Sequence, residues 1–211
     1  MTEVVRDAYD ARAEEYAKLF LDHLDRVPLD RERLEAFATL VSDGDGDGVV
    51  ADVGCGPGNV VGHLAGLGVA AVGYDISPAM IDIARRTFPG SKFQVGDLAC
   101  LDITDSSLAG IVSRYSLIHT DPARLIDVFA EWFRVLEPEA PVLVSFFASD
   151  SSDTHGLPFD HAVVTAHALF PETIVAEMRS VGFERLEMST RKPQDDERPL
   201  DHGAILGCRG G

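Results

Sequence analysis

The sequence is poor in cysteine and contains no long apolar segment. Its three cysteines, Cys55, Cys100 and Cys208, are far apart and form no C-x-x-C pair, so neither a zinc site nor a disulfide framework is indicated. Such isolated thiols are typical of reducing compartments, and a cytoplasmic location is expected. The amino terminus is charged and has no apolar signal segment, and no run is long enough to cross a bilayer.

Basic residues are also scarce. The chain of 211 residues has 18 Lys and Arg against 35 Asp and Glu, which gives a formal net charge of −17. A surplus of negative charge repels phosphate backbones and acidic lipid surfaces, so neither nucleic acid nor a membrane is expected as a partner. The sequence carries no signal for a particular oligomeric state.

The remaining composition is that of a globular protein, with 45% hydrophobic and 25% charged residues. The length suffices for one domain with a real core but not for two ordinary ones. We therefore expect a single domain over residues 1–211, with a helical cap at 1–41 and a core at 49–211. The cap is predicted as helices at 2–20 and 29–41.

Residues 49–60, VVADVGCGPGNV, are the most informative stretch. An apolar run with strand character ends in a glycine-rich turn, and a helical pattern follows, which predicts the start of a βαβ unit. The free N–H groups of such a helix start suit an anionic ligand. The dinucleotide fingerprint G-x-G-x-x-G is not matched, because the third glycine, Gly58, comes one position early and Asn59 occupies the expected place.

Carboxylates follow the next two predicted strands. Asp75 comes after the strand at 69–74, about 20 residues beyond the glycines, where an acidic residue binds the hydroxyls of a ribose. The alternative is that Asp75 and Ser77 only cap the helix predicted at 78–87. Asp97 follows the strand at 92–95 and, taken alone, reads as a turn residue.

The turn has an acidic residue followed by the pattern G-x-G-x-G, formed by Asp52, Gly54, Gly56 and Gly58. This pattern resembles motif I of the class I S-adenosylmethionine-dependent methyltransferases, notably the ubiquinone- and menaquinone-biosynthesis-like enzymes. The resemblance implies that Asp97 accepts a hydrogen bond from the adenine amino group and that Leu98 meets the ring. Tyr9, Asp10 and Tyr16 are similar to a helix that covers the cofactor in this family; packing is the alternative role. The implied cofactor-binding residues are Tyr9, Tyr16, Asp52, Gly54, Cys55, Gly56, Gly58, Asp75, Ile76, Asp97, Leu98 and Arg114.

The family also implies a fold. It is an α/β three-layer Rossmann-like sandwich with a mostly parallel seven-stranded sheet, an antiparallel terminal strand and an N-terminal helical cap. The further elements predicted from the sequence are strands at 108–113, 141–147, 183–190 and 204–208 and helices at 60–67, 121–135 and 172–181, with long loops at 148–168 and 191–202.

The implied reaction is in-line methyl transfer from S-adenosylmethionine to a small-molecule acceptor, with S-adenosylhomocysteine as product and no metal. His119, after the strand at 108–113, is the candidate general base, because its pKa suits proton transfer at neutral pH. Packing is its alternative role, and His155 is the second candidate. A non-catalytic S-adenosylmethionine-binding module and, less readily, a nicotinamide oxidoreductase stay open as alternatives.

Two regions are rich in residues that could bind a metal, but metal binding is not expected in either. Asp43, Asp45 and Asp47 imitate the first half of a calcium-binding loop, but its twelfth position, which needs a bidentate Glu, is Gly54. The histidines of the 148–168 loop form no H-x-x-x-H pair on a clear helix.

Overall fold

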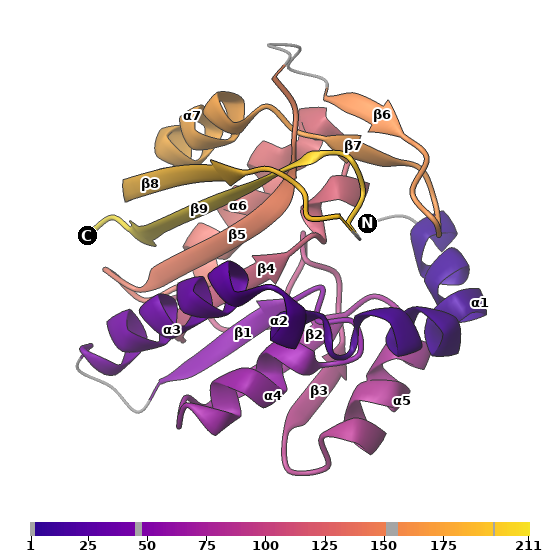
Figure 1. Cartoon of the computed structure of the whole chain (residues 1–211). Coiled ribbons are helices and arrows are strands. Elements are labelled where there is room, and N and C mark those ends of the chain that lie inside the picture. Colours follow the sequence, from indigo (N-terminus) through magenta and orange to yellow (C-terminus); the bar gives the residue numbers. More distant parts are fainter. Residues whose placement is uncertain (1–2, 45–47, 151–155, 196) are drawn as a thin grey trace.

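The computed structural model describes residues 3–44, 48–150, 156–195 and 197–211. Its centre is a seven-stranded sheet in the order β3-β2-β1-β4-β5-β9-β8 (Figure 1). The strands are β1 (Val49–Val53), β2 (Ala71–Asp75), β3 (Lys92–Val95), β4 (Leu108–Arg114), β5 (Pro141–Ala148), β8 (Phe183–Arg191) and β9 (Asp201–Arg209). The pairs from β3 to β5 are parallel, and β9 is antiparallel to both of its neighbours, β5 and β8. The predicted α/β sheet is therefore confirmed.

Helices cover both faces of this sheet. They are α1 (Glu3–Phe20), α2 (His23–Arg26), α3 (Pro28–Ser42), α4 (Asn59–Gly66), α5 (Pro78–Thr87), α6 (Leu125–Val135) and α7 (Pro171–Val181). Because side chains alternate along a strand, Ala51 and Val53 pack in the cluster of α6 and α7, whereas Val50 packs in that of α3 and α4. Figure 1 shows these helix pairs on opposite faces.

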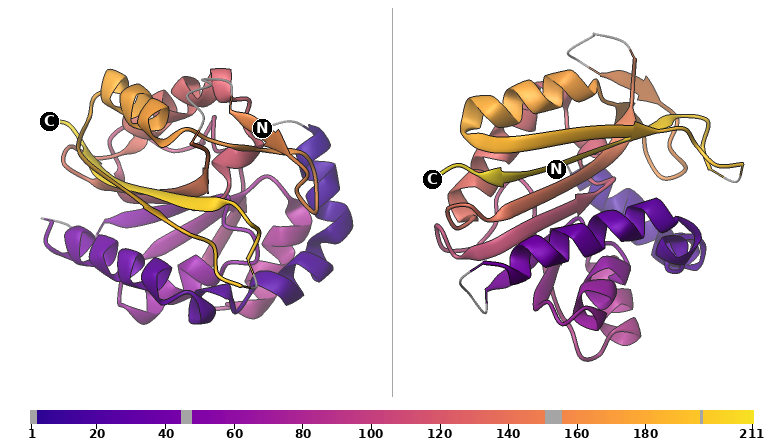
Figure 2. Two further views of the ribbon diagram at one scale, coloured as in Figure 1. Left: turned by 45° about the horizontal axis from the view of Figure 1, so that its top comes forward. Right: turned by 60° about the vertical axis from the view of Figure 1, so that its left-hand side comes forward.

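The N-terminal helix α1 lies along α5 (Figure 2). Its Ala13 and Ala17 pack on Met80, and the Asp10 carboxylate accepts a hydrogen bond from the N–H of Ala79, at 3.1 Å, and another from the Ser77 hydroxyl. A carboxylate at a helix start is favourable, because it satisfies free N–H groups and faces the positive end of the helix dipole. Asp10 thus fixes α1 above the tip of β2.

Two parts of the chain differ from expectation. The region at 148–168 contains a small antiparallel ribbon, β6 (Leu157–Phe159) and β7 (Ala166–Ala168), in place of a continuous loop. Strands of three residues are too short to show an alternating pattern, which is why the sequence did not reveal them. The segment before α6 is split into 3₁₀ turns, η1 (Leu117–His119) and η2 (Pro122–Arg124).

Some expectations concern undescribed residues: the helix start at Thr2, the aspartates of the calcium-like loop at 45 and 47, and the second candidate base His155. Among the described helices, none has the length and apolar character needed to span a bilayer.

Candidate functional site

The glycine turn joins β1 to α4 and is fixed to the neighbouring strand. The N–H groups of Gly54 and Cys55 both donate to the Tyr74 carbonyl of β2, at 2.7 and 3.0 Å. Gly56 has a φ of 50°, and a Cβ placed there would meet no atom within 4 Å, so its backbone faces open space. Gly58 has a φ of 89°, and a Cβ there would lie 2.8 Å from the Phe93 ring. Gly56 therefore leaves room for a ligand, whereas Gly58 permits close packing.

Asp75 at the tip of β2 is hydrogen-bonded to this turn. One carboxylate oxygen accepts from the N–H of Gly56 and the other from the N–H of Ser77, each at 2.8 Å. Burial raises the pKa of Asp75 to about 6, in spite of these two hydrogen bonds, which act in the opposite direction. Ser77 itself caps α5 by accepting from the Met80 N–H, so the expected cap and the position beside the turn coexist.

Two adjoining cavities lie at the tips of β1, β2 and β4. The larger measures about 490 Å³ and the smaller about 40 Å³. Both are lined by Tyr16, Gly54, Gly56, Arg114 and Tyr115. Because the carboxyl ends of parallel strands meet at one edge of an open α/β sheet, this is the position at which such folds bind ligands.

Most of the residues assigned to a cofactor from the sequence line these cavities. Asp52 and Cys55 line the larger one, and Tyr9, Asp75 and Ile76 line the smaller one.

Gly58, Asp97 and Leu98 line neither cavity. Asp97 accepts a hydrogen bond from the N–H of Ala99, and the buried Leu98 accepts one from the Trp132 indole through its carbonyl. The adenine contacts of Asp97 and Leu98 therefore stay predictions.

Asp52 and Arg114 both line the larger cavity, and each has one buried polar atom without a partner among the described residues. Asp52, at the end of β1, is 1% exposed, and its Oδ2 accepts no hydrogen bond among the described residues. Burial raises the pKa of Asp52 to about 7, although the nearby Arg114 lowers it. The Nε of Arg114 is likewise buried and has no partner within the described part of the chain. An unpaired buried polar atom costs free energy, so a rearrangement that pairs these two atoms with a polar ligand would be favourable.

His119 lines the smaller cavity and contacts the N-terminal helix. Its Nε2 lies 2.7 Å from the Tyr9 hydroxyl, and the Tyr9 ring also packs edge-on against Tyr16. Burial, together with the neighbouring His161, lowers the pKa of His119 to about 3. His119 is thus neutral at pH 7 and close to the predicted ribose carboxylate, Asp75, rather than inside the larger cavity.

A buried ion network beneath the larger cavity was not foreseen. Asp30 of α3 is 2% exposed, and its carboxylate accepts from Arg114 at 2.7 Å and from Arg33 at 3.2 Å, with Arg191 of β8 at 3.7 Å. These residues come from three distant parts of the chain, and the sequence offered only a charge-rich segment at 191–202 as a signal.

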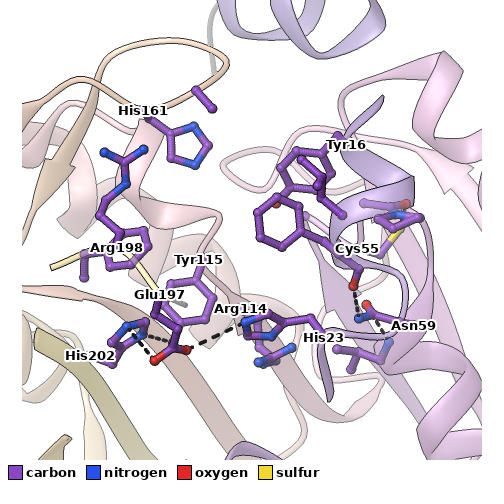
Figure 3. A pocket seen from close by; sticks show the side chains of 18 of the residues that line it. Tyr16, His23, Cys55, Asn59, Arg114, Tyr115, His161, Glu197, Arg198 and His202 are labelled. Atoms are coloured by element: carbon purple, nitrogen blue, oxygen red, sulfur yellow. Dashed lines mark hydrogen bonds and ion pairs between the residues drawn. The ribbon is translucent and has the colours of Figure 1, made fainter. Parts of the chain in front are cut away.

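Glu197 extends this network into the larger cavity. Arg191 donates two hydrogen bonds to its carboxylate, at 2.5 and 2.7 Å, and the N–H of Gln194 a third at 2.8 Å. Although burial acts to raise it, these hydrogen bonds lower the pKa of Glu197 to about 2. The Nε2 atoms of His202 and His23 lie 3.5 and 3.7 Å from the carboxylate (Figure 3).

Tyr115 completes this side of the cavity. Its φ of 55° is unusual for a residue with a side chain, and its hydroxyl lies 2.6 Å from Nδ1 of His202. Its ring centre is 5.0 Å from that of Phe147. In the described part of the chain, no group of three His, Cys, Asp or Glu side chains converges as a metal site.

The part of the chain that carries the glycine turn is similar to known proteins. Residues 50–139 match the model of a methyltransferase domain family. The demethylmenaquinone methyltransferase of Chlorobaculum parvum is 28% identical over 138 residues, covering 64% of this chain and 56% of that protein. The malonyl-[acyl-carrier protein] O-methyltransferase of Yersinia pestis is 29% identical over 108 residues, covering 51% and 40%. The chain thus spans about half the length of these relatives.

Solved structures share the whole fold. Magnesium protoporphyrin IX methyltransferase from Synechocystis, with bound S-adenosylmethionine, superimposes with a TM-score of 0.70 at 20% identity, covering 98% of this chain and 96% of that one. A methyltransferase from Archaeoglobus fulgidus gives 0.68 at 17% identity, covering 92% and 100%. Residues 50–139 thus match a methyltransferase domain, and the chain as a whole has the fold of S-adenosylmethionine-dependent methyltransferases.

Proposed function

We propose that this protein transfers a methyl group from S-adenosylmethionine to a small molecule held in the larger cavity. The observation that carries the proposal is the convergence of the tips of β1, β2 and β4 on two adjoining cavities, with Gly56 open toward them. The related proteins named above are methyltransferases, which supports the same reaction class.

The residues at the site fit this cofactor. The amino-acid end of S-adenosylmethionine carries an ammonium and a carboxylate, and the cavity-lining Asp52 and Arg114 are one acidic and one basic side chain for them. Their unpaired Oδ2 and Nε atoms are buried, so a local rearrangement has to open them to the ligand. Asp75 supplies a buried carboxylate for ribose hydroxyls. The open space at Gly56 would let the ligand lie against the backbone.

The smaller cavity bears on how a nucleoside enters. Its volume of about 40 Å³ has room for about one water molecule. A nucleoside therefore fits beside Asp75 only after the smaller cavity widens. We propose that α1 acts as a movable cover and that its Tyr9–His119 contact opens for this. This assigns Tyr9 and Tyr16 the covering role that the resemblance implies.

When bound, S-adenosylmethionine supplies a methyl group activated by a sulfonium. The protein's part is to hold the acceptor in line and to keep water out, and positioning of this kind can lower a barrier by roughly 7–11 kcal/mol. His119 stays the first candidate to accept a proton from the acceptor, with Tyr9 orienting its ring. Burial lowers its pKa to about 3, however, so the structure does not give it the near-neutral pKa expected from the sequence. Four expectations from the sequence stay predictions: the in-line geometry, the absence of a required metal, a single domain over 1–211 and a cytoplasmic location.

The test is a screen of small-molecule acceptors, read by release of S-adenosylhomocysteine. Release above the acceptor-free rate supports the proposed methyl transfer. A lower rate in His119→Ala, with unchanged affinity for S-adenosylhomocysteine, supports His119 as the general base. Unchanged turnover in that variant removes His119 from the role. A protein that binds the cofactor but methylates no acceptor is the non-catalytic module, the second candidate.

A further inference from the structure

One wall of the larger cavity is built from aromatic rings. We call the rings of Tyr115, Phe147, His161 and His202 the aromatic wall; all four line the cavity. Phe147 lies 5.0 Å from Tyr115 and 5.2 Å from His202, measured between ring centres. Phe159 packs edge-to-face against two of these rings, with its centre 5.4 Å from that of Phe147 and 6.2 Å from that of His161. These spacings are those of interacting aromatic pairs, so the wall is a packed surface with ring faces and edges to offer a ligand.

Arg198 places a positive charge at the edge of this wall. Its guanidinium donates to the Asp160 carbonyl at 2.7 Å and lies 5.3 Å from the centre of the Phe159 ring. Both partners are neutral, and no ion pair joins Arg198 to a carboxylate of the described residues. Figure 3 shows Arg198 beside His161, across the cavity from Cys55 and Asn59 of the glycine turn.

The other two arginines given as lining the cavity each have a carboxylate partner among the described residues, and Arg114 is also the one proposed above for the cofactor. Arg114 is bound to Asp30, and Arg26 reaches Asp22 and the Leu19 carbonyl.

The negative charge of the Glu197 carboxylate is balanced by Arg191, which donates two hydrogen bonds to it. The histidines add no positive charge near pH 7, because burial lowers the pKa of both His161 and His202 to about 4. The guanidinium of Arg198 is therefore the charge left for a ligand on this side of the cavity.

We infer that the acceptor is a planar, unsaturated carboxylic acid, which lies against the aromatic wall and pairs its carboxylate with Arg198. This inference rests on the proposed function, since it names the class of molecule that the larger cavity takes. A guanidinium binds a carboxylate through two parallel hydrogen bonds, and Arg198 uses only one of its five donors on Asp160. In a protein with a net charge of −17, such a local charge is needed to draw in an anion.

The experiment compares matched probes on protein saturated with S-adenosylhomocysteine. Benzoate, benzamide and cyclohexanecarboxylate are titrated by calorimetry or ligand-observed NMR. Benzoate is expected to bind ~10-fold or more tightly than benzamide, which lacks the charge, and more tightly than cyclohexanecarboxylate, which lacks the planar ring.

Arg198→Gln keeps a donor for the Asp160 carbonyl but removes the charge, and it should abolish the preference for benzoate over benzamide. Arg124→Gln is the matched control, because the Arg124 side chain on η2 is 66% exposed and pairs with Asp127, away from the cavity lining. The control should bind all three probes as the wild type does.

Three results would overturn the inference: equal affinity for benzoate and benzamide, equal affinity for benzoate and cyclohexanecarboxylate, or weaker binding of S-adenosylhomocysteine in Arg198→Gln. The last result would assign Arg198 to the cofactor's own carboxylate. Failure of the wild type to bind S-adenosylhomocysteine would instead refute the proposed function.

Discussion

The Asp75 carboxylate accepts a hydrogen bond from the backbone N–H of Gly56, 2.8 Å away, so the tip of β2 and the glycine turn after β1 form one unit. Asp75→Asn keeps the size of the side chain and removes its charge. We expect S-adenosylmethionine affinity to fall by roughly 10- to 100-fold, since hydrogen bonds to a charged group contribute about 1.5–3 kcal/mol. Calorimetric titration measures this. Equal affinities would refute the ribose assignment, and Asp127→Asn, on the outer side of α6, is the control.

The two glycines of the turn should separate binding from folding. Gly56→Ala introduces strain of about 1–3 kcal/mol from its φ of 50° and places a methyl group in open space where the ligand is expected. Gly58→Ala adds a clash with the Phe93 ring to similar strain.

We therefore expect Gly58→Ala to have the lower free energy of unfolding in urea. We expect Gly56→Ala to lose more cofactor affinity than Gly58→Ala, relative to the stability that each variant loses. Tight cofactor binding by Gly56→Ala would show that the ligand does not lie against this backbone.

Asp52 should make stability depend on pH in a definite direction. Its pKa is raised to about 7 in the folded protein, whereas an unfolded Asp titrates near 3.9. Between these values the folded state binds the extra proton, so the stability contributed by Asp52 falls as the pH rises, by at most about 1.4 kcal/mol per pH unit.

Asp52→Asn removes this dependence. The difference in unfolding free energy, variant minus wild type, should grow from pH 4 to pH 7 and level off above it. Urea unfolding at a series of pH values tests this; a difference that is constant with pH would mean that Asp52 is ionised throughout.

Asp30 is expected to be a stability residue. Its buried carboxylate is shared by Arg33, Arg114 and Arg191, and removing one partner of a buried ion network leaves uncompensated charge, at a cost of about 3–5 kcal/mol. Asp30→Ala should therefore lower the free energy of unfolding by about that amount. Asp22→Ala, whose carboxylate is 68% exposed and pairs with Arg26, should change it by less than about 1 kcal/mol. Similar losses in both variants would contradict the network's role.

The sequence predicted the fold well because each main element carries a local pattern. The apolar runs of β1 and β2 and the glycine turn between β1 and α4 are continuous in the chain, and all three were recognised. The three-residue strands β6 and β7 have no period to detect, and their pairing depends on residues brought together only by folding.

Of the residues that line the two cavities, the sequence singled out mainly those in or next to local motifs. Asp75 and Gly56 lie in local motifs, whereas Arg198 and Glu197 enter the cavity from a segment whose sequence shows only a high charge content. His202 faces the cavity from β9, and its contact with Tyr115 joins residues 87 positions apart. Such long-range contacts between single side chains leave no pattern in a sequence taken alone.

The most direct measurement compares the binding of S-adenosylmethionine and NADH to the purified protein. S-adenosylmethionine should bind with one site per chain, Asp75→Asn should weaken it, and NADH should not compete. Binding of NADH in preference to S-adenosylmethionine would contradict the assignment of the strand tips to an adenosyl sulfonium.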